Sequence, residues 1–196
     1  ENRVPCEYVS RRKFLQGLLG TAAGVTAFGS LGFAARLAWA AARCAWGAYY
    51  YSGQVCISVQ RIFVEKSVHE EFRRLLVANI KELKLGDPGD ETTDIGPLID
   101  EASAVRVEDW LKEAVGRGAK LWAGGPRQGL VLPPALVEGA PADCKVSCEE
   151  VFGPVATLEA VDSRQKALER LADTKYGLQA GIFTNDLRFA HEAFDR

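Results

Sequence analysis

From residue 61 onward, the chain alternates between strand-like and helix-like segments. Short apolar runs rich in β-branched residues are typical of strands, and apolar residues that recur every three or four positions are typical of amphipathic helices. Strands regularly separated by helices favour an α/β domain with a largely parallel sheet flanked by helices. We expect strands within residues 61–66, 119–125, 133–140, 154–161 and 180–184, and helices within 68–83, 101–115, 163–172 and from 185 or 186 to the end of the chain.

The composition excludes several classes of function. With 196 residues the chain can bury the core of one ordinary domain. Its 26 acidic and 24 basic residues leave a formal charge of -2, so nothing indicates nucleic acid as a partner, and a small neutral or anionic substrate fits better. Five irregularly spaced cysteines and two histidines predict neither a disulfide framework nor a metal site.

The amino-terminal part carries a basic cluster followed by an uncharged run. Arg11, Arg12 and Lys13 precede residues 14–35, which are free of charge and rich in Gly, Ala and Leu. This layout is typical of a signal peptide or a membrane anchor. The heptapeptide SRRKFLQ at residues 10–16 resembles the twin-arginine export signal. A buried Gly/Ala helix with a basic first turn is the alternative.

We therefore expect a signal-like or membrane-anchor segment at residues 1–35 and an α/β domain at residues 36–196. The triplet AWA at residues 38–40 resembles a small-residue cleavage site. A working export signal predicts a periplasmic or inner-membrane-associated protein with membrane contact through residues 14–35, and otherwise the protein is expected in the cytoplasm. Because the chain begins at Glu1 and contains no methionine, it is expected to be processed or a fragment.

Cys56 is the cysteine whose surroundings most favour chemistry. It follows Gly53 and Gln54, where glycine permits a tight turn, and the aromatic residues at 49–51 can wall a site against water. A thiol becomes a strong nucleophile as the thiolate, which needs a helix amino terminus, a cation or a polarised neighbour. On spacing alone, a buried structural cysteine is the alternative.

Several separated motifs give the chain a family resemblance. These motifs are GQVCISVQR at 53–61, GDP at 86–88, DIGPLI at 94–99, GAKLWAGG at 118–125, EEVFGPV at 149–155 and YGLQAGIFT at 176–184. With them, the sequence from about residue 36 to 196 resembles the catalytic domain of the aldehyde dehydrogenase superfamily. GQVCISVQR looks like the family's active-cysteine segment, EEVFGPV like its cofactor-ribose motif, and YGLQAGIFT like its late turn and strand.

The resemblance implies NAD(P)-dependent oxidation of an aldehyde to a carboxylic acid. It assigns Cys56 as the nucleophile that forms a thiohemiacetal and then a thioester, with its backbone N–H as half of an oxyanion hole. It implies that Glu150 hydrogen-bonds the nicotinamide ribose and that Phe152 packs beside the nicotinamide ring. It implies the family's α/β catalytic fold, NAD or NADP as the cofactor, a small-molecule aldehyde as the substrate, and a homo-oligomer if the full family architecture is present.

The sequence also departs from the family pattern. The family's general-base glutamate has no match upstream of Cys56, because no Asp or Glu occurs between Glu7 and Glu65. No phosphate-cradling G-x-G-x-x-G loop precedes a strand and helix either. Two alternatives follow: an exported or membrane-tethered domain that is catalytically incomplete, or an interaction subunit whose open sheet edge is covered by a partner.

Overall fold

The computed structural model describes residues 32–195. The chain divides after Leu37 into two units, Glu1–Leu37 and Ala38–Arg196. The expected amino-terminal apolar helix and the twin-arginine-like segment fall on residues that, apart from 32–35, lie outside the described part. Among residues 32–195, no helix is long and apolar enough to cross a membrane.

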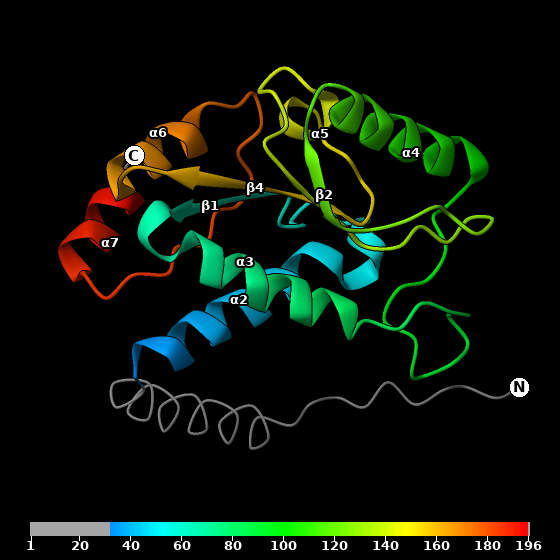
Figure 1. Cartoon of the computed structure of the whole chain (residues 1–196), viewed down its shortest axis with the longest axis horizontal. Coiled ribbons are helices and arrows are strands. Elements are labelled where there is room, and N and C mark those ends of the chain that lie inside the picture. The colour runs from blue at the N-terminus through cyan, green and yellow to red at the C-terminus, as the bar shows by residue number, and fades with distance from the viewer. Residues whose placement is uncertain (1–31, 196) are drawn as a thin grey trace, which may run out of the picture. The chain divides into compact units, whose positions relative to one another are not determined.

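A four-stranded sheet forms the centre of the larger unit, in the order β1-β4-β3-β2 (Figure 1). Strand β4 (Val155–Val161) pairs in parallel with both β1 (Arg61–Glu65) and β3 (Ala135–Glu138), and β2 (Lys120–Ala123) adds an antiparallel edge. The predicted largely parallel α/β arrangement is confirmed.

Helices lie on both sides of the sheet. Figure 1 shows α3 on one side, and α4 and α5 on the other. Helix α6 contacts β1 and β4, and α3 contacts β1, β2 and β4. Two helix starts have the expected side-chain caps, because Ser163 accepts from the Lys166 N–H at 3.2 Å and Asp186 accepts from the Arg188 N–H at 2.9 Å. The helices are α2 (Phe33–Tyr49), α3 (Lys66–Lys81), α4 (Glu101–Gly116), α5 (Lys145–Cys148), α6 (Arg164–Ala172) and α7 (Leu187–Phe194).

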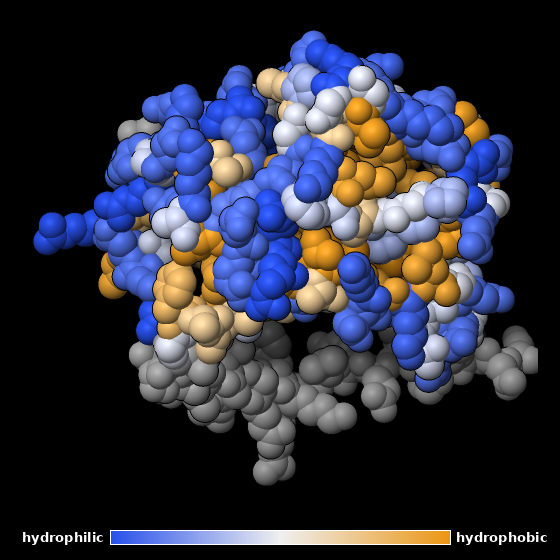
Figure 2. Space-filling model, in the orientation of Figure 1, coloured by the Kyte–Doolittle hydropathy of each residue, from blue (hydrophilic) through white to orange (hydrophobic). Residues whose placement is uncertain are grey.

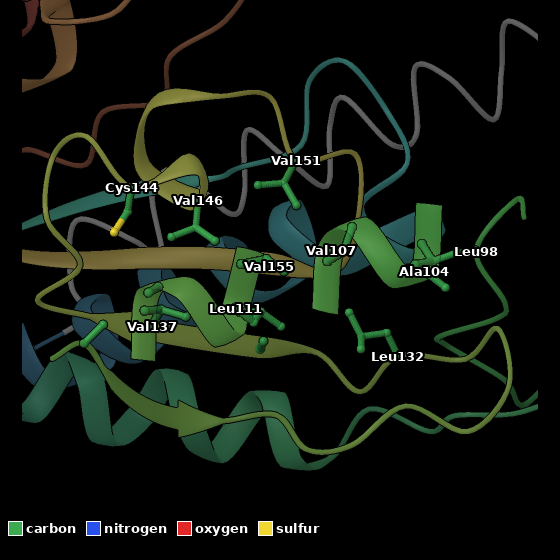
Figure 3. Close-up of a cluster of buried hydrophobic side chains, with 13 residues drawn as sticks. Leu98, Ala104, Val107, Leu111, Leu132, Val137, Cys144, Val146, Val151 and Val155 are labelled. Atoms are coloured by element: carbon green, nitrogen blue, oxygen red, sulfur yellow. The ribbon is translucent and has the colours of Figure 1, made fainter. Parts of the chain in front are cut away.

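One hydrophobic cluster fills the space between α4, α5 and the sheet (Figure 3). Ala135 and Val137 lie two residues apart on β3 and therefore share a face, and Val155 lies opposite Ala135 in the register. Burying each Val or Leu side chain stabilises the fold by about 1.5–3 kcal/mol. The members from α4 recur at the spacing of one helix face: Ala104, Val107, Leu111 and Ala114.

The surface combines charged side chains with exposed apolar ones. Figure 2 shows polar and charged residues over most of one face, with apolar residues between them. Scattered apolar exposure of this kind is common in folded proteins.

The strand expected at residues 180–184 is wrong. These residues form no regular secondary structure and are exposed. A strand needs a neighbour to receive its backbone hydrogen bonds, and this segment joins neither edge of the four-stranded sheet. Instead, the Phe183 ring contacts the Trp39 ring edge to face, with centroids 5.5 Å apart.

Candidate functional site

Cys56 lies on an exposed turn just after α2. A short 3-10 helix, η1 (Tyr50–Gly53), follows α2, and the Ser58 N–H then donates to the Val55 carbonyl at 3.0 Å to close the turn that holds the cysteine. The Cys56 backbone N–H has no hydrogen-bond partner among the described residues. Both the thiol and the adjacent N–H are therefore available to a ligand.

The backbone that leads into this turn is strained. Tyr51, Ser52 and Gly53 have φ values of 52°, 56° and 68° in succession. Left-handed backbone is comfortable for glycine and costs about 1–3 kcal/mol for other residues. The surrounding structure must offset this strain, and such strain is concentrated at functional sites in proteins generally.

Hydrogen bonds to the loop at residues 94–99 hold the strained segment. The buried Ser52 hydroxyl donates to the Gly96 carbonyl at 2.9 Å. The Gln54 amide donates to the Pro97 carbonyl at 3.3 Å and accepts from the Ile99 N–H at 2.8 Å. The DIGPLI motif therefore acts as a support for the cysteine loop.

A backbone contact joins the cysteine loop to the loop of the EEVFGP motif. A Cβ on Gly53 would lie 2.1 Å from the Gly153 carbonyl oxygen, and a Cβ on Gly153 would lie 2.9 Å from a methyl group of Val107. A side chain at either position would therefore collide with its neighbour, the Gly153 carbonyl for position 53 and Val107 for position 153. The structure brings the loop of Cys56 against the loop that contains Phe152, although the two are about a hundred residues apart in sequence.

Glu150 and Phe152 are both exposed at this second loop. Phe152 has φ 47°, another left-handed residue that is not glycine. The Glu150 carboxylate has no hydrogen-bond or ion-pair partner among the described residues. Its oxygens are free to accept hydrogen bonds from a ligand's hydroxyl groups, and the Phe152 ring offers an apolar surface one residue further along.

Glu149 plays a different part from Glu150. Its carboxylate accepts from the Lys175 ammonium at 2.8 Å and from the Tyr176 hydroxyl at 2.8 Å. These hydrogen bonds, chiefly the one from Lys175, hold the pKa of Glu149 below its usual value. Of the acidic pair, the first residue is thus tied to the protein and the second faces solvent.

The aromatic wall expected at residues 49–51 does not form as a set. Tyr49 is buried, its hydroxyl donates to the Ala135 carbonyl at 3.0 Å, and burial raises its pKa. Tyr51 is 78% exposed. Tyr49 therefore belongs to the core and Tyr51 to the surface, although the Tyr50 and Tyr51 rings still contact each other edge to face, with centroids 5.6 Å apart.

The other described cysteines are less suited to chemistry. Cys44 and Cys144 are buried, and burial raises the pKa of the Cys44 thiol to about 11 and also raises the pKa of Cys144. Cys148 is partly buried, with its thiol 3.6 Å from the Asp143 carbonyl. Among the four described cysteines Cys56 is the exposed one, so the structural alternative of a buried Cys56 is wrong.

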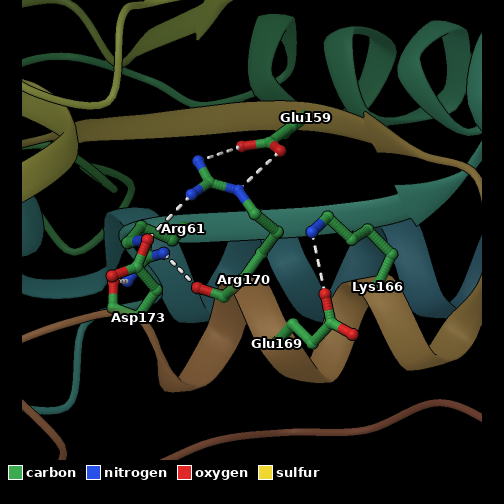
Figure 4. Close-up of polar contacts among 6 residues, drawn as sticks. All are labelled: Arg61, Glu159, Lys166, Glu169, Arg170 and Asp173. Atoms are coloured by element: carbon green, nitrogen blue, oxygen red, sulfur yellow. Dashed lines mark hydrogen bonds and ion pairs between the residues drawn. The ribbon is translucent and has the colours of Figure 1, made fainter.

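A hollow of about 1060 Å³ lies elsewhere, and Cys148 rather than Cys56 is among its lining residues. Its lining includes residues of β1, β4 and α6, several of which belong to the ion-pair network drawn in Figure 4. The Arg170 guanidinium binds both Glu159 oxygens at 2.9 Å, and Arg61 donates to the Asp173 carbonyl at 3.2 Å. Its cationic and acidic lining residues are equal in number, so the hollow has no excess charge for an ionic ligand.

The chemistry of this second loop is compatible with the nicotinamide end of a dinucleotide. A carboxylate such as that of Glu150 can accept hydrogen bonds from ribose hydroxyls, and an exposed ring such as that of Phe152 can cover a flat heterocycle. Both lie on the loop that contacts the cysteine loop through Gly153. Sequence reasoning missed Ser52 and Gln60, whose hydrogen bonds hold these two loops in place.

Comparison with known proteins gives consistent results. The model of the aldehyde dehydrogenase family matches residues 33–196. The 3-sulfolactaldehyde dehydrogenase of Priestia aryabhattai is 46% identical over 142 residues, which are 72% of this chain and 30% of that protein. A lactaldehyde dehydrogenase of Methanococcus maripaludis is 43% identical over 144 residues, covering 74% of this chain and 31% of that protein.

Solved structures show the same likeness. Aldehyde dehydrogenase 21 from Physcomitrella patens, in complex with succinate, matches with a TM-score of 0.76 and 40% identity over 79% of this chain and 32% of that one. An NADP-dependent glyceraldehyde-3-phosphate dehydrogenase from Bacillus halodurans, with NADP bound, matches with a TM-score of 0.77 and 34% identity. This match covers 81% of this chain and 33% of that one. The chain thus spans about 30% of the length of the curated relatives it matches.

Proposed function

Because the chain belongs to the aldehyde dehydrogenase family, we propose that the protein oxidises an aldehyde to a carboxylic acid with NAD or NADP, and that Cys56 is its nucleophile. The observation that carries the proposal is that the exposed Cys56, whose backbone N–H has no partner within residues 32–195, lies on a loop in contact with the loop of Glu150 and Phe152. The nucleophile and the residues suited to a cofactor are therefore held in adjacent loops.

The Cys56 thiolate adds to the aldehyde carbonyl carbon, and the carbonyl oxygen becomes an oxyanion. The Cys56 N–H donates to that oxyanion, where a preorganised backbone donor is effective because it needs no reorganisation during the reaction. When bound, the dinucleotide supplies the hydride acceptor that converts the thiohemiacetal into a thioester. Water then attacks the thioester and releases the carboxylic acid, and the thiol of Cys56 is restored.

Glu150 and Phe152 orient the nicotinamide end of the cofactor in this proposal. The carboxylate of Glu150, which is exposed, accepts hydrogen bonds from ribose hydroxyls, and Phe152 packs beside the nicotinamide ring. Hydride transfer depends steeply on the distance and angle between donor and acceptor, so residues that only orient the cofactor have large effects on rate.

Reduction of NAD or NADP in the presence of an aldehyde tests the proposal. The names of two relatives, 3-sulfolactaldehyde dehydrogenase and lactaldehyde dehydrogenase, make small hydroxyaldehydes the first substrates to try, followed by aliphatic and aromatic aldehydes. We expect aldehyde-dependent growth of nicotinamide absorbance with at least one of the two dinucleotides. If the intact protein reduces neither dinucleotide with any aldehyde of this panel, the proposal is contradicted.

A second candidate function is that of a family relative that binds aldehyde without oxidising it, alone or as an interaction subunit. The observation in its favour is that no Asp or Glu lies between Glu7 and Glu65, so this stretch supplies no carboxylate to deprotonate the hydrolytic water. It predicts that Cys56 still reacts with iodoacetamide or an aldehyde while no dinucleotide is reduced. Measurable turnover by the same sample excludes it.

We also propose that the residues before the catalytic part direct export or membrane attachment and that the whole protein forms a homo-oligomer. The SRRKFLQ sequence and the uncharged run at 14–35 support the first proposal, and the family relationship supports the second. Mass spectrometry of the mature amino terminus tests the first, and a cytoplasmic, uncleaved protein contradicts it. Light scattering tests the second, and a monomeric mass contradicts it.

A further inference from the structure

The Gln60 side chain links the cysteine segment to the loop of Glu150. Gln60 lies four residues after Cys56, and its amide nitrogen donates to the Val146 carbonyl at 3.0 Å and to the Glu149 carbonyl at 2.6 Å. Its amide oxygen accepts from the Val151 N–H at 2.9 Å. Both ends of one amide are thus used on the backbone of residues 146–151.

These bonds fix the backbone on both sides of Glu150. The Glu149 carbonyl belongs to the peptide unit that precedes the Glu150 Cα, and the Val151 N–H belongs to the unit that follows it. Each peptide unit is planar and rigid, so restraining both units also restrains the two backbone dihedrals of Glu150. The direction in which the Glu150 side chain leaves the backbone is therefore set by Gln60.

The backbone of Gln60 is itself held by the sheet. The Gln60 backbone carbonyl accepts from the Thr157 N–H at 2.7 Å and from the Thr157 hydroxyl at 3.2 Å. Gln60 immediately precedes β1, whose first residue Arg61 pairs with Thr157 in β4. The amide is thus anchored to the rigid parallel pair of strands, while it reaches a loop whose own residues 149–154 contain no strand or helix.

We propose that Gln60 is a positioning residue that holds the Glu150 loop in the orientation required by the nicotinamide ribose. This inference rests on the proposed function for its catalytic consequence, and the coupling of Gln60 to the loop can be measured without turnover. Removing the amide would leave two carbonyls and one N–H without their partner, each in a partly buried setting that penalises an unpaired group.

The test uses two variants and a control in the intact protein. Gln60→Ala removes all three side-chain bonds. Gln60→Glu keeps the shape and the acceptor for Val151, but replaces the donating nitrogen by an oxygen that faces two carbonyls. Protonation of that carboxyl restores one donor. Gln165→Ala is the control, because Gln165 is an exposed residue on α6.

In steady-state kinetics, we expect Gln60→Ala to raise the KM for the dinucleotide at least fivefold, while the KM for the aldehyde and the alkylation rate of Cys56 stay within twofold. Gln165→Ala should leave all three within twofold of the wild-type protein. A dinucleotide KM within twofold in Gln60→Ala overturns the inference. The inference is also overturned if Gln60→Ala raises the KM for the aldehyde, slows the alkylation of Cys56 and lowers the Tm to a similar degree. Such a result would show that Gln60 has a general structural role.

Hydrogen exchange at residues 149–152 gives a reading that is independent of turnover. Gln60→Ala should exchange at least tenfold faster there than the wild-type protein, with α4 unchanged. Gln60→Glu should exchange faster at neutral pH and recover toward the wild-type value as its carboxyl is protonated, after correction for intrinsic rates. Equal exchange in all proteins overturns the inference, whereas absent turnover with the expected exchange contradicts only the proposed function.

Discussion

Gly53 and Gly153 lie in direct backbone contact, so that a Cβ on Gly53 would lie 2.1 Å from the Gly153 carbonyl oxygen. This contact joins the turn that presents Cys56 to the loop that presents Phe152. A glycine is needed at position 53 for two separate reasons, its φ of 68° and the absence of space for a side chain. One of the contacts that place the two loops is therefore made by backbone atoms alone.

Gly53→Ala should destabilise the protein far more than an alanine at an unobstructed glycine. Gly139 is a matched control because its φ is 73° and a Cβ there would meet nothing within 4 Å. We expect Gly139→Ala to cost about 1 kcal/mol in the free energy of unfolding, and Gly53→Ala to cost about 3 kcal/mol because backbone must also move. Urea denaturation measures both. Equal costs would show that the predicted steric contact is absent.

Ser52 combines a hydrogen bond with unfavourable backbone. It is buried, has φ 56°, and its hydroxyl donates to the Gly96 carbonyl at 2.9 Å. Ser52→Ala removes the hydrogen bond and keeps the strain, so we expect a loss of about 1–3 kcal/mol. Ser52→Gly removes both the hydrogen bond and the strain, so urea denaturation should show a smaller decrease in its free energy of unfolding. A larger loss for glycine than for alanine would argue against strain at this position.

The cysteines should differ in their rates of alkylation. At pH 8 the exposed Cys56 should react with iodoacetamide first among the four described cysteines, followed by the partly buried Cys148. The buried Cys44, whose pKa is raised to about 11, should react at least a hundredfold more slowly than Cys56. Peptide mass spectrometry over time gives each rate. Labelling of Cys44 before Cys56 in folded protein would contradict the structure.

The contact between Glu149 and the Lys175–Tyr176 segment should weaken in acid. The pKa of Glu149 is lowered in the folded state, chiefly by the hydrogen bond from Lys175. Its contribution to stability is therefore fully present above the ordinary glutamate pKa of about 4.3 and is lost as pH falls through the lower folded value. Hydrogen exchange at residues 174–177 should rise over that acidic range.

Glu149→Gln is the control for this pH dependence. Its amide cannot titrate, so exchange at residues 174–177, corrected for intrinsic rates, should be faster than in the wild-type protein at neutral pH and nearly independent of pH. Residues in α4 report on global unfolding in both proteins. If the wild-type segment shows the same flat profile as Glu149→Gln, the ion pair does not hold it.

Local pattern predicted most of the secondary structure. The spacing of apolar residues in α3 and α4 and the caps at Ser163 and Asp186 are properties of short windows of sequence, and the structure confirms them. The strand expected at 180–184 failed because composition describes which residues suit a strand, whereas a strand also needs a neighbouring strand with a free edge at the right place.

The site could be predicted only in part. The motifs identify Cys56 and Glu150, but they do not predict that both side chains are exposed. The contact of Gly53 with Gly153 and the bonds of Gln60 to the Glu150 loop join residues about ninety to a hundred positions apart. Nothing in the local sequence around Gln60 marks it, because its role depends on which loop the fold places opposite its amide.

If Cys56 carries the acyl group during aldehyde oxidation, that acyl-enzyme can be trapped on the cysteine. The intact protein is mixed with aldehyde and dinucleotide, quenched in acid during turnover and digested for peptide mass spectrometry. We expect the acyl mass on the peptide that contains Cys56, and no dinucleotide reduction by Cys56→Ala while Cys148→Ala remains active. Reduction by Cys56→Ala, or an acyl group on another cysteine, would contradict it.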